Sequence, residues 1–202
     1  MMAFPMAAPK LRASEREDEL DPGVLQRCRQ GDPLAFRAFV VRFEKPVFAL
    51  LSRVLGRGPH VEDLAQETFL KAYRALPRFD PEGPAQVSTW LFTIATRTAI
   101  DAVRKRRVSE RALADSLQQV DVEHADTPER QAELTRVRRA ISQALGELPV
   151  DQRAAFVLFE IHGLSLPEVA EALDIPAATA KTRVFRARKK LEDALSAFKE
   201  GS

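Results

Sequence analysis

The chain has 202 residues, of which 45% are hydrophobic and 30% are charged. This length suits two small helical domains or one larger core. Because 31 basic residues are balanced by 29 acidic ones, the formal net charge is only +2. A strongly basic overall field is excluded, so any binding of nucleic acid must come from local clusters of charge.

Cysteine and histidine usage argues against two kinds of stabilising site. Cys28 is the only cysteine, and His60, His124 and His162 have no partner cysteine and no repeated ligand spacing. A disulfide framework and a structural zinc site are therefore not expected. The apolar N-terminal start is interrupted by prolines, and no later stretch approaches a membrane span. We expect no cofactor, no membrane insertion and a cytoplasmic location.

The first predicted elements follow a charged, flexible extension at residues 1–21. A helical pattern begins at Gly23, and the break "GDP" at residues 31–33 separates a short helix from a long one. The stretch "HVEDLAQETFLKAYRAL" predicts a third helix that ends at Pro77. Its expected buried stripe consists of Val61, Leu64, Ala65, Thr68, Phe69 and Ala72.

A turn-rich loop, "RFDPEGPAQ", precedes the fourth predicted helix, "STWLFTIATRTAIDAVRKRR". Ser88 or Thr89 is the expected N-terminal cap of this helix. The helix begins apolar and ends strongly basic.

Apolar periodicity fails over residues 108–130, which carry an excess of acids and predict a flexible linker. Helical patterns resume over residues 131–198. The predicted fold class is therefore all-α: two small helical domains, residues 22–107 and 131–198, joined by a flexible acidic linker.

The second domain contains the layout of a helix-turn-helix. Ser165 is placed to cap a helix with Glu168 three residues later, the turn is "DIP", and Pro176 is expected to start the next helix. On that last helix, the inward positions are Ala180, Val184, Ala187 and Leu191.

The outward positions of the last helix are suited to DNA. An arginine there can pair with a guanine edge in a major groove, and lysines can meet phosphates. The expected base-reading row is Thr179, Thr182, Arg183 and Arg186, and the expected phosphate contacts are Lys181, Lys189 and Lys190. The alternative interpretation is an amphipathic surface helix with solvated charges, but the cap, the turn and the preceding short helix favour DNA binding.

Four stretches in one order carry a family resemblance: "VEDLAQETFLKAYRALPRF", "STWLFTIATRTAIDAVRKRR", "LGELPVDQRAAFVLFEIHGLSLPEVAEAL" and "TAKTRVFRARKKL". Together they resemble the extracytoplasmic-function (group IV) sigma factors of bacterial RNA polymerase, within the sigma-70 family. The resemblance covers roughly residues 22–198. Several motifs in a fixed order are far more specific than any single motif.

The resemblance implies that the third helix binds core RNA polymerase through Asp63, Gln66 and Glu67. A solvated acidic face is the alternative interpretation of these residues. Paired carboxylates can also serve acid–base catalysis or a metal, but no convergent histidine, nucleophile or glycine-rich loop accompanies them. We therefore expect a protein that is not an enzyme.

The resemblance further implies that the fourth helix and its preceding loop capture and melt the promoter's minus-ten element. Strand opening needs a pocket for a flipped base and cations for bared phosphates. The implied minus-ten residues are Asp80, Gln86, Val87, Trp90, Arg97, Arg104, Lys105, Arg106 and Arg107. For Trp90, packing into the core is an equal alternative to stacking on a base.

The chain departs from the family pattern at three positions. Family members often have an aromatic residue at the position of Val87, an asparagine at Arg97 and a larger aliphatic residue at Ala180. The first two departures concern the minus-ten contacts. The third implies closer packing, or a small void, between the last two helices.

The implied partners are bacterial core RNA polymerase, promoter DNA and an anti-sigma factor, and the free chain is expected to be a monomer. The strongest rival is a dimeric helix-turn-helix regulator with no role in polymerase. That rival leaves the acidic third helix and the basic fourth helix unexplained. A helical enzyme or an RNA-binding scaffold is a more distant alternative, which fails for want of a site.

Overall fold

The computed structural model describes residues 20–56, 58–110 and 140–200. All regular elements in this part are helical, and a segment at 140–146 is helical as well. In chain order the others are α1 (Pro22–Arg29), α2 (Pro33–Leu55), α3 (Pro59–Ala75), η2 (Leu76–Arg78), α4 (Val87–Glu110), α6 (Val150–Phe156), η3 (Val157–Ile161), α7 (Leu166–Leu173) and α8 (Ala177–Glu200).

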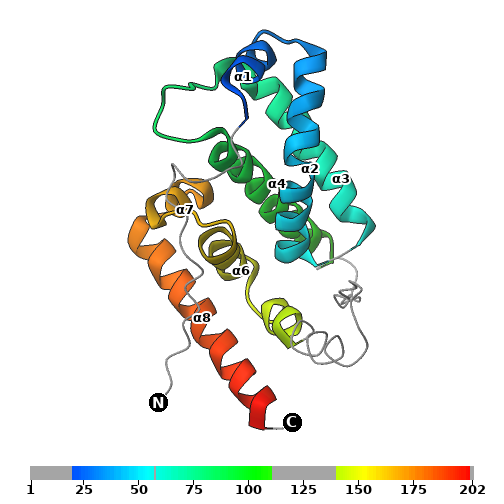
Figure 1. The fold of residues 1–202 in the computed structure, drawn as a ribbon. Helices are drawn as coiled ribbons and strands as arrows, with labels where there is room; N and C mark the ends of the chain where they lie inside the picture. The colour runs from blue at the N-terminus through cyan, green and yellow to red at the C-terminus, as the bar shows by residue number, and fades with distance from the viewer. Residues whose placement is uncertain (1–19, 57, 111–139, 201–202) are drawn as a thin grey trace, which may run out of the picture.

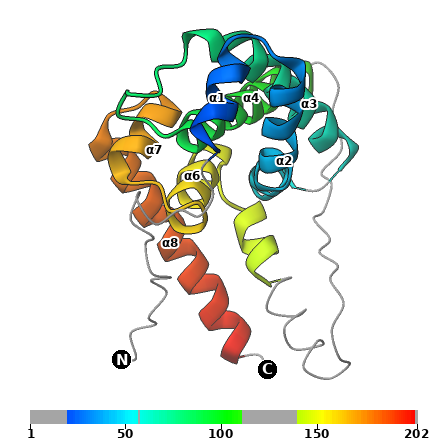
Figure 2. The ribbon, with the colours of Figure 1, turned by 45° about the horizontal axis from the view of Figure 1, so that its top comes forward.

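Figures 1 and 2 show the helices in two groups, α1 to α4 and α6 to α8, with α4 beside α7. Most of the predicted linker and of the predicted N-terminal extension lies outside the described residues. Helix α4 continues to Glu110, beyond the predicted domain end at residue 107. Within the described ranges, no helix combines the length and the hydrophobicity needed to cross a bilayer.

Each of the first two helices begins with an aspartate cap. An Asp21 carboxylate oxygen accepts from the backbone N–H groups of Gly23 and Val24. Asp32 accepts in the same way from Leu34 at 2.8 Å, and both helices have proline in the first turn. These contacts satisfy backbone donors that have no partner inside the helix. They confirm "GDP" as the break between a short and a long helix.

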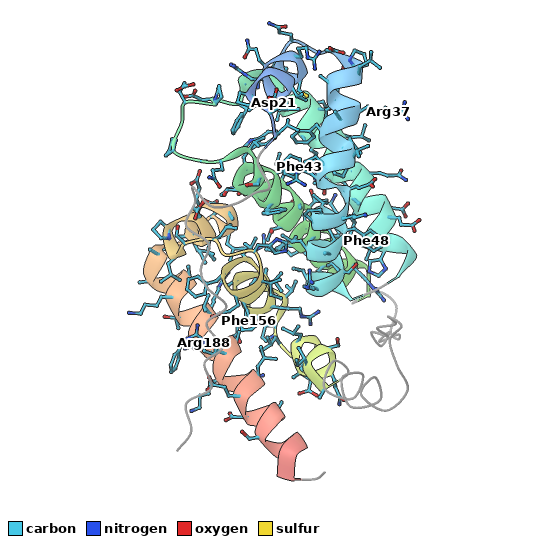
Figure 3. All side chains as sticks on the ribbon, in the orientation of Figure 1. Asp21, Arg37, Phe43, Phe48, Phe156 and Arg188 are labelled. Carbon is cyan, nitrogen blue, oxygen red and sulfur yellow. The ribbon has the colours of Figure 1, made fainter. Side chains whose placement is uncertain are left out.

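An aromatic cluster fills the centre of the first group. Phe39 and Phe43 are fully buried on α2, with ring centroids 4.9 Å apart, and Phe69 of α3 meets Phe39 edge-on at 6.4 Å. Figure 3 shows Phe43 within this group. Thr68 is fully buried, as predicted. Its hydroxyl donates a hydrogen bond to the Leu64 carbonyl.

The predicted cap of α4 is wrong. The helix begins at Val87, and the Trp90 N–H donates to the Gln86 carbonyl at 3.0 Å, which places the first helical turn before Ser88. Ser88 and Thr89 are instead buried inside that turn. The helix starts early because Val87 buries its side chain in the core, which residues 80–86 before it do not do.

The helix-turn-helix forms as predicted, with a shift of one residue. Ser165 accepts from the Glu168 N–H, and the Glu168 carboxylate accepts from the Ser165 N–H at 2.7 Å, so both halves of a capping box are present. Asp174 turns the chain with a φ of 53°. Helix α8 starts at Ala177, one residue after Pro176, because the carbonyl of Pro176 accepts the first bonds of the helix.

The two groups share apolar packing. One cluster of buried side chains runs from Phe39 on α2 through Leu91 on α4 to Val169 on α7. A second cluster, beside α8, contains Phe156 and Leu191, and Figure 3 shows Phe156 between α6 and α8.

Arg153 of α6 joins the two groups through polar contacts. Its guanidinium donates to the Val54 carbonyl at the end of α2, at 2.9 Å, and to the carbonyls of Gly146 and Leu148. Burial lowers the pKa of Arg153, because the charged group loses hydration. A half-buried arginine therefore links α6 to a carbonyl of α2 and to two carbonyls of the segment before α6.

Candidate nucleic-acid and polymerase interfaces

Two of the four residues in the base-reading row predicted on α8, Thr182 and Arg186, lie away from the core contacts of the helix. Ala180, Val184, Ala187 and Leu191 are buried, as the sequence indicates. Thr182 and Arg186 are exposed, and Thr179 is half-buried. The Thr182 hydroxyl donates to the Ala178 carbonyl at 2.9 Å, one helical turn earlier. The predicted phosphate contacts Lys181, Lys189 and Lys190 are all exposed.

Arg183 differs from the rest of this row. Its side chain is only 25% exposed, and its guanidinium lies 3.8 Å from the carboxylate of Asp151 on α6. The residue therefore faces an acid of its own domain rather than open solvent. The sequence pattern predicts an outward position for Arg183 and does not reveal this partner.

Two further side chains on α8, Phe185 and Arg188, lie outside the predicted row. Phe185 is 65% exposed, three residues after Thr182 and four before Lys189. An apolar side chain among basic ones suits contact with a thymine methyl group. The signal in the sequence is an aromatic residue at an outward helical position. Arg188, in contrast, forms an ion pair with Glu160 of η3 and fastens α8 to its own domain (Figure 3).

The predicted minus-ten loop begins with a tight turn at residues 80–83. The carboxylate of Asp80 accepts from the Glu82 N–H at 3.0 Å, and its carbonyl accepts from Gly83 at 3.2 Å. Trp90 is half-buried and packs against the ring of Phe79, with centroids 5.1 Å apart. Its indole ring therefore packs against the fold and is also partly accessible. This position is compatible both with core packing and with stacking on a base.

Val87 requires a correction. Its side chain is only 2% exposed and packs in the core, so it is unavailable for the minus-ten contact expected of it. Gln86, directly before it, is half-buried. An apolar residue at the start of a helix is as suitable for the core as for DNA, and the sequence does not distinguish the two.

The basic residues of α4 do not share one environment. Arg104, Lys105 and Arg106 are exposed near the end of the helix. Arg107 lies in α4, but its side chain is outside the described part. Arg97 bonds across to the second domain, to the carbonyls of Glu171 and Ala172 on α7, at 2.9 and 3.3 Å.

The predicted polymerase-binding residues Asp63, Gln66 and Glu67 are exposed on α3. Glu67 forms an ion pair with Lys71 at 2.8 Å, and Lys71 donates to the Thr98 hydroxyl on α4. Glu67 thus belongs to a small polar chain that links the two helices, while Asp63 has no such partner among the described residues.

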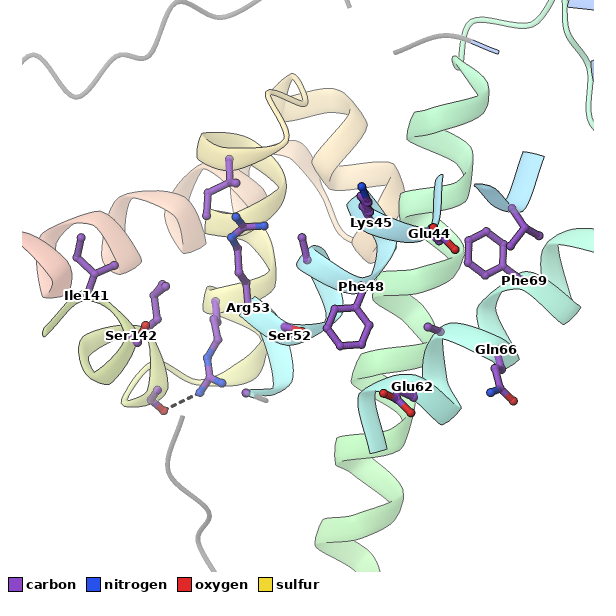
Figure 4. A pocket seen from close by; sticks show the side chains of 18 residues that line it. Glu44, Lys45, Phe48, Ser52, Arg53, Glu62, Gln66, Phe69, Ile141 and Ser142 are labelled. Atoms are coloured by element: carbon purple, nitrogen blue, oxygen red, sulfur yellow. Dashed lines mark hydrogen bonds between the residues drawn. The ribbon is translucent and has the colours of Figure 1, made fainter. Parts of the chain in front are cut away.

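A groove of about 960 Å³ lies between the domains. Figure 4 shows Phe48 and Phe69 on one side of it and Ile141 and Ser142 on the other. Gln66 lines the groove, whereas Asp63 and Glu67 do not. The three predicted polymerase-binding residues therefore do not all face the same side of α3. Sequence reasoning missed this groove because its walls are far apart in the chain.

Within residues 20–56, 58–110 and 140–200, no three His, Cys, Asp or Glu side chains gather in the manner of a metal site. The acidic residues of α3 lie on an exposed helical face.

Each of the two domains matches a known protein family. The Sigma-70 region 2 family matches residues 39–108, and the family described as Sigma-70, region 4 matches residues 138–191.

Curated relatives match along nearly their whole length. The ECF RNA polymerase sigma-E factor of Haemophilus influenzae is 35% identical over 184 residues, which cover 88% of this chain and 96% of that protein. The RNA polymerase sigma-H factor of Pseudomonas aeruginosa is 32% identical, with 88% and 94% covered. The sigma-E factor of Escherichia coli K12 is 34% identical, with 88% and 95% covered.

Two solved structures share the fold. The sigma factor RpoE of Bartonella quintana, solved with the anti-sigma factor NepR, superposes with a TM-score of 0.66 at 24% identity and covers 80% of this chain and 96% of its own. CnrH, solved with the cytosolic domain of CnrY, gives a TM-score of 0.59 at 30% identity, with 86% and 96% covered. By its two matched regions and its full-length relatives, the chain belongs to the sigma-70 family and is an extracytoplasmic-function sigma factor.

Proposed function

We propose that this chain binds core RNA polymerase through α3 and reads two promoter elements, one with each domain. The observation that carries the proposal is the combination, in one chain, of an exposed acidic face on α3, a basic end on α4 and a capped helix-turn-helix. We assign residues 22–107 to polymerase and minus-ten binding, and residues 131–198 to minus-thirty-five binding.

Within the second domain, Thr179, Thr182, Arg183 and Arg186 are the proposed base-reading residues. Lys181, Lys189 and Lys190 are the proposed phosphate contacts, because all three are exposed beside the row. To these we add Phe185, whose exposed ring is suited to thymine methyl groups.

Within the first domain, we propose that Arg104, Lys105, Arg106 and Arg107 neutralise phosphates of the opened strand. Asp80, Gln86 and Trp90 are proposed to form the base-capturing region. The role needs no catalytic residue of its own, and its place of action is that of the polymerase, the cytoplasm.

In vitro transcription tests the proposed function. Purified core polymerase and a promoter library are incubated with and without this protein, and the start sites are sequenced. We expect a set of start sites that depends on the protein and shares two spaced elements. A library with no dependent start site would contradict the sigma role, whereas binding of paired half-sites as a dimer would favour the rival regulator.

We further propose that the groove between the domains receives an anti-sigma factor. The groove offers apolar side chains from both domains, including Phe48 and Ile161, each 42% exposed, and CnrH was solved with a partner polypeptide. Such a partner would present an amphipathic helix to these walls.

A genomic two-hybrid screen with the wild type and with Phe48→Glu tests this site. We expect a partner that binds the wild type, loses binding to Phe48→Glu and silences the dependent start sites. Phe185→Glu is the matched control, since it places the same charge on an aromatic position outside the groove. If a silencing partner bound the wild type, Phe48→Glu and Phe185→Glu equally, its binding site would lie outside the groove.

A further inference from the structure

Arg183 and Arg188 flank the buried stripe of α8 on opposite sides. Arg183 lies one residue before Val184, and Arg188 lies one residue after Ala187, and both Val184 and Ala187 are buried. Because an α-helix turns by about 100° per residue, each arginine points to its own side of the stripe. An attachment at either position resists rotation of the helix about its axis.

Each of these arginines has an acid of its own domain as partner. Arg183 lies beside Asp151 of α6, and Arg188 forms an ion pair with Glu160 of η3. A base contact by Arg183 takes its guanidinium from Asp151, so this pair does not last when DNA binds. Arg188 follows Arg186 by two residues and therefore points about 160° away from it. The pair of Arg188 and Glu160 is thus the attachment that remains when the outer face of α8 meets DNA.

The fold gives Glu160 a rigid position. The three residues before it, Val157, Leu158 and Phe159, are buried. The His162 N–H donates to the Val157 carbonyl at 3.1 Å, which closes a π-helical turn that contains Glu160. Single turns of this kind often mark functional sites. The Glu160 side chain is only 14% exposed, so its attraction to a guanidinium is screened less than that of a surface pair.

The buried stripe by itself offers limited resistance to rotation of α8. Two of its four residues, Ala180 and Ala187, have side chains that end at the β-carbon. Helices interlock when ridges of side chains fill grooves of a neighbour, and alanine provides only a low ridge. A rotation of about 10° moves an atom about 6 Å from the axis by about 1 Å. A recognition site must be held within about 0.5 Å, so base reading needs a second attachment.

We propose that Glu160 is a positioning residue for promoter recognition, because its hold on Arg188 fixes the rotation of α8 at which the base-reading row meets the bases. The positioning role rests on the proposed function of α8 in DNA binding. Glu160 acts through Arg188 and not through a base contact of its own. A simple charge effect predicts the opposite result, since removal of an acid beside a basic helix strengthens binding to every DNA sequence.

The first experiment compares Glu160→Gln with Glu192→Gln, each assembled with core polymerase. Glu192 is the matched control, because it is exposed four residues after Arg188 and has no ion pair with any residue that the structure describes. Binding of a dependent promoter is measured against the same promoter with a scrambled minus-thirty-five element. We expect the preference for the intact element to fall about tenfold in Glu160→Gln, as for one mismatched base pair, and to stay unchanged in Glu192→Gln. An equal loss in both variants would replace the positioning role with a general charge effect.

The second experiment determines whether several base contacts change together. Promoters with one base pair substituted at each position of the element are compared. Arg186→Ala removes one proposed reader and should flatten the preference at one position. Glu160→Gln should flatten it at several positions at once, because a rotation of α8 displaces every residue of the row. Loss at one position alone would contradict a role in orientation.

Exchange of the two charges provides a rescue. Glu160→Arg and Arg188→Glu each place like charges at the contact, whereas the double variant restores an ion pair with its charges exchanged. We expect each single variant to lose the preference and the double variant to regain about half of it or more. A double variant that is folded by circular dichroism but regains no preference would count against the contact. Glu160→Gln, which nearly keeps the shape of the side chain, decides the result where a charge-reversed variant does not fold.

The outcomes also separate the positioning role from the proposed function. Absence of any preference for the intact element with the wild type would overturn the proposed function of α8, and with it the positioning role. A wild-type preference that Glu160→Gln retains in full would overturn the positioning role alone.

Discussion

At the scale of single residues, Arg183 has an acid of its own domain, Asp151, within 3.8 Å, and it also belongs to the proposed base-reading row. Binding of DNA must draw the guanidinium away from that acid. The pair is partly exposed, so its separation costs little. A bidentate contact with a guanine edge contributes more than such a pair.

We therefore predict that Arg183→Ala lowers affinity for a minus-thirty-five duplex by about 1–3 kcal/mol and relaxes sequence preference at one position. Lys189→Ala should weaken binding to all sequences and reduce the salt slope by about 1. Fluorescence anisotropy with promoter variants at two salt concentrations measures both. Retention of the wild-type sequence preference by Arg183→Ala would assign the base-reading face to other residues.

Arg153 donates a hydrogen bond from α6 to α2 and two more to the segment before α6. Truncation leaves carbonyls of Val54, Gly146 and Leu148 without their donor. Because hydrogen bonds to a charged group contribute about 1.5–3 kcal/mol, we predict that Arg153→Gln lowers the free energy of unfolding by about 2–3 kcal/mol. Urea denaturation measures this free energy. Lys190→Gln, a substitution at an exposed position, is the control and should stay within about 0.5 kcal/mol of the wild type.

At the scale of elements, α8 has a structural side and a recognition side. Leu191 is 6% exposed and packs with Phe156 in the second core cluster, whereas Phe185 is 65% exposed. We predict that Leu191→Ala destabilises the protein by about 2–5 kcal/mol, and that Phe185→Ala changes stability by less than about 0.5 kcal/mol. Denaturant unfolding compares the two. A large loss of stability in Phe185→Ala would mean that its ring supports the fold.

Helix α3 presents its acids in two directions. Glu62 lines the groove, while Asp63, one residue later, does not. We predict that Asp63→Lys weakens binding of core polymerase about tenfold or more, because a like-charge contact across an interface costs several kcal/mol. Fluorescence anisotropy measures the binding of core polymerase, and circular dichroism measures the helical content of the same variant.

Glu62→Lys makes the same change of charge on the neighbouring position and should affect polymerase binding much less. Similar weakening by both variants would indicate general repulsion rather than a specific contact at Asp63. Equal loss of helicity would identify Asp63 as a structural residue.

At the scale of the whole molecule, the two domains share an apolar core and polar contacts, yet they are joined by a chain segment with little apolar surface. We predict that limited proteolysis cuts within residues 108–130 before it cuts either domain. Mass spectrometry of the first fragments locates the cut. Resistance of this segment while other sites are cleaved would contradict the prediction of a linker.

The sequence by itself determined the features that depend on near neighbours in the chain. The break at "GDP" and the cap at Ser165 are such features: Asp32 accepts from the N–H of Leu34, two residues away, and Ser165 from that of Glu168, three residues away. Helical periodicity likewise identified the buried side of α8 and the exposed acids of α3, because burial recurs every three to four residues. Family membership followed from motifs in a fixed order.

Only the tertiary structure decided the partners of the long basic side chains. Arg97 bonds a carbonyl 75 residues away, and Arg153 bonds one 99 residues away. A guanidinium on a flexible stem can satisfy its donors with phosphate, water or any nearby carbonyl, so residue type does not choose among them. Backbone carbonyls are present in every residue, and only the packing of α4 on α7 and of α6 on α2 brings these particular ones within reach.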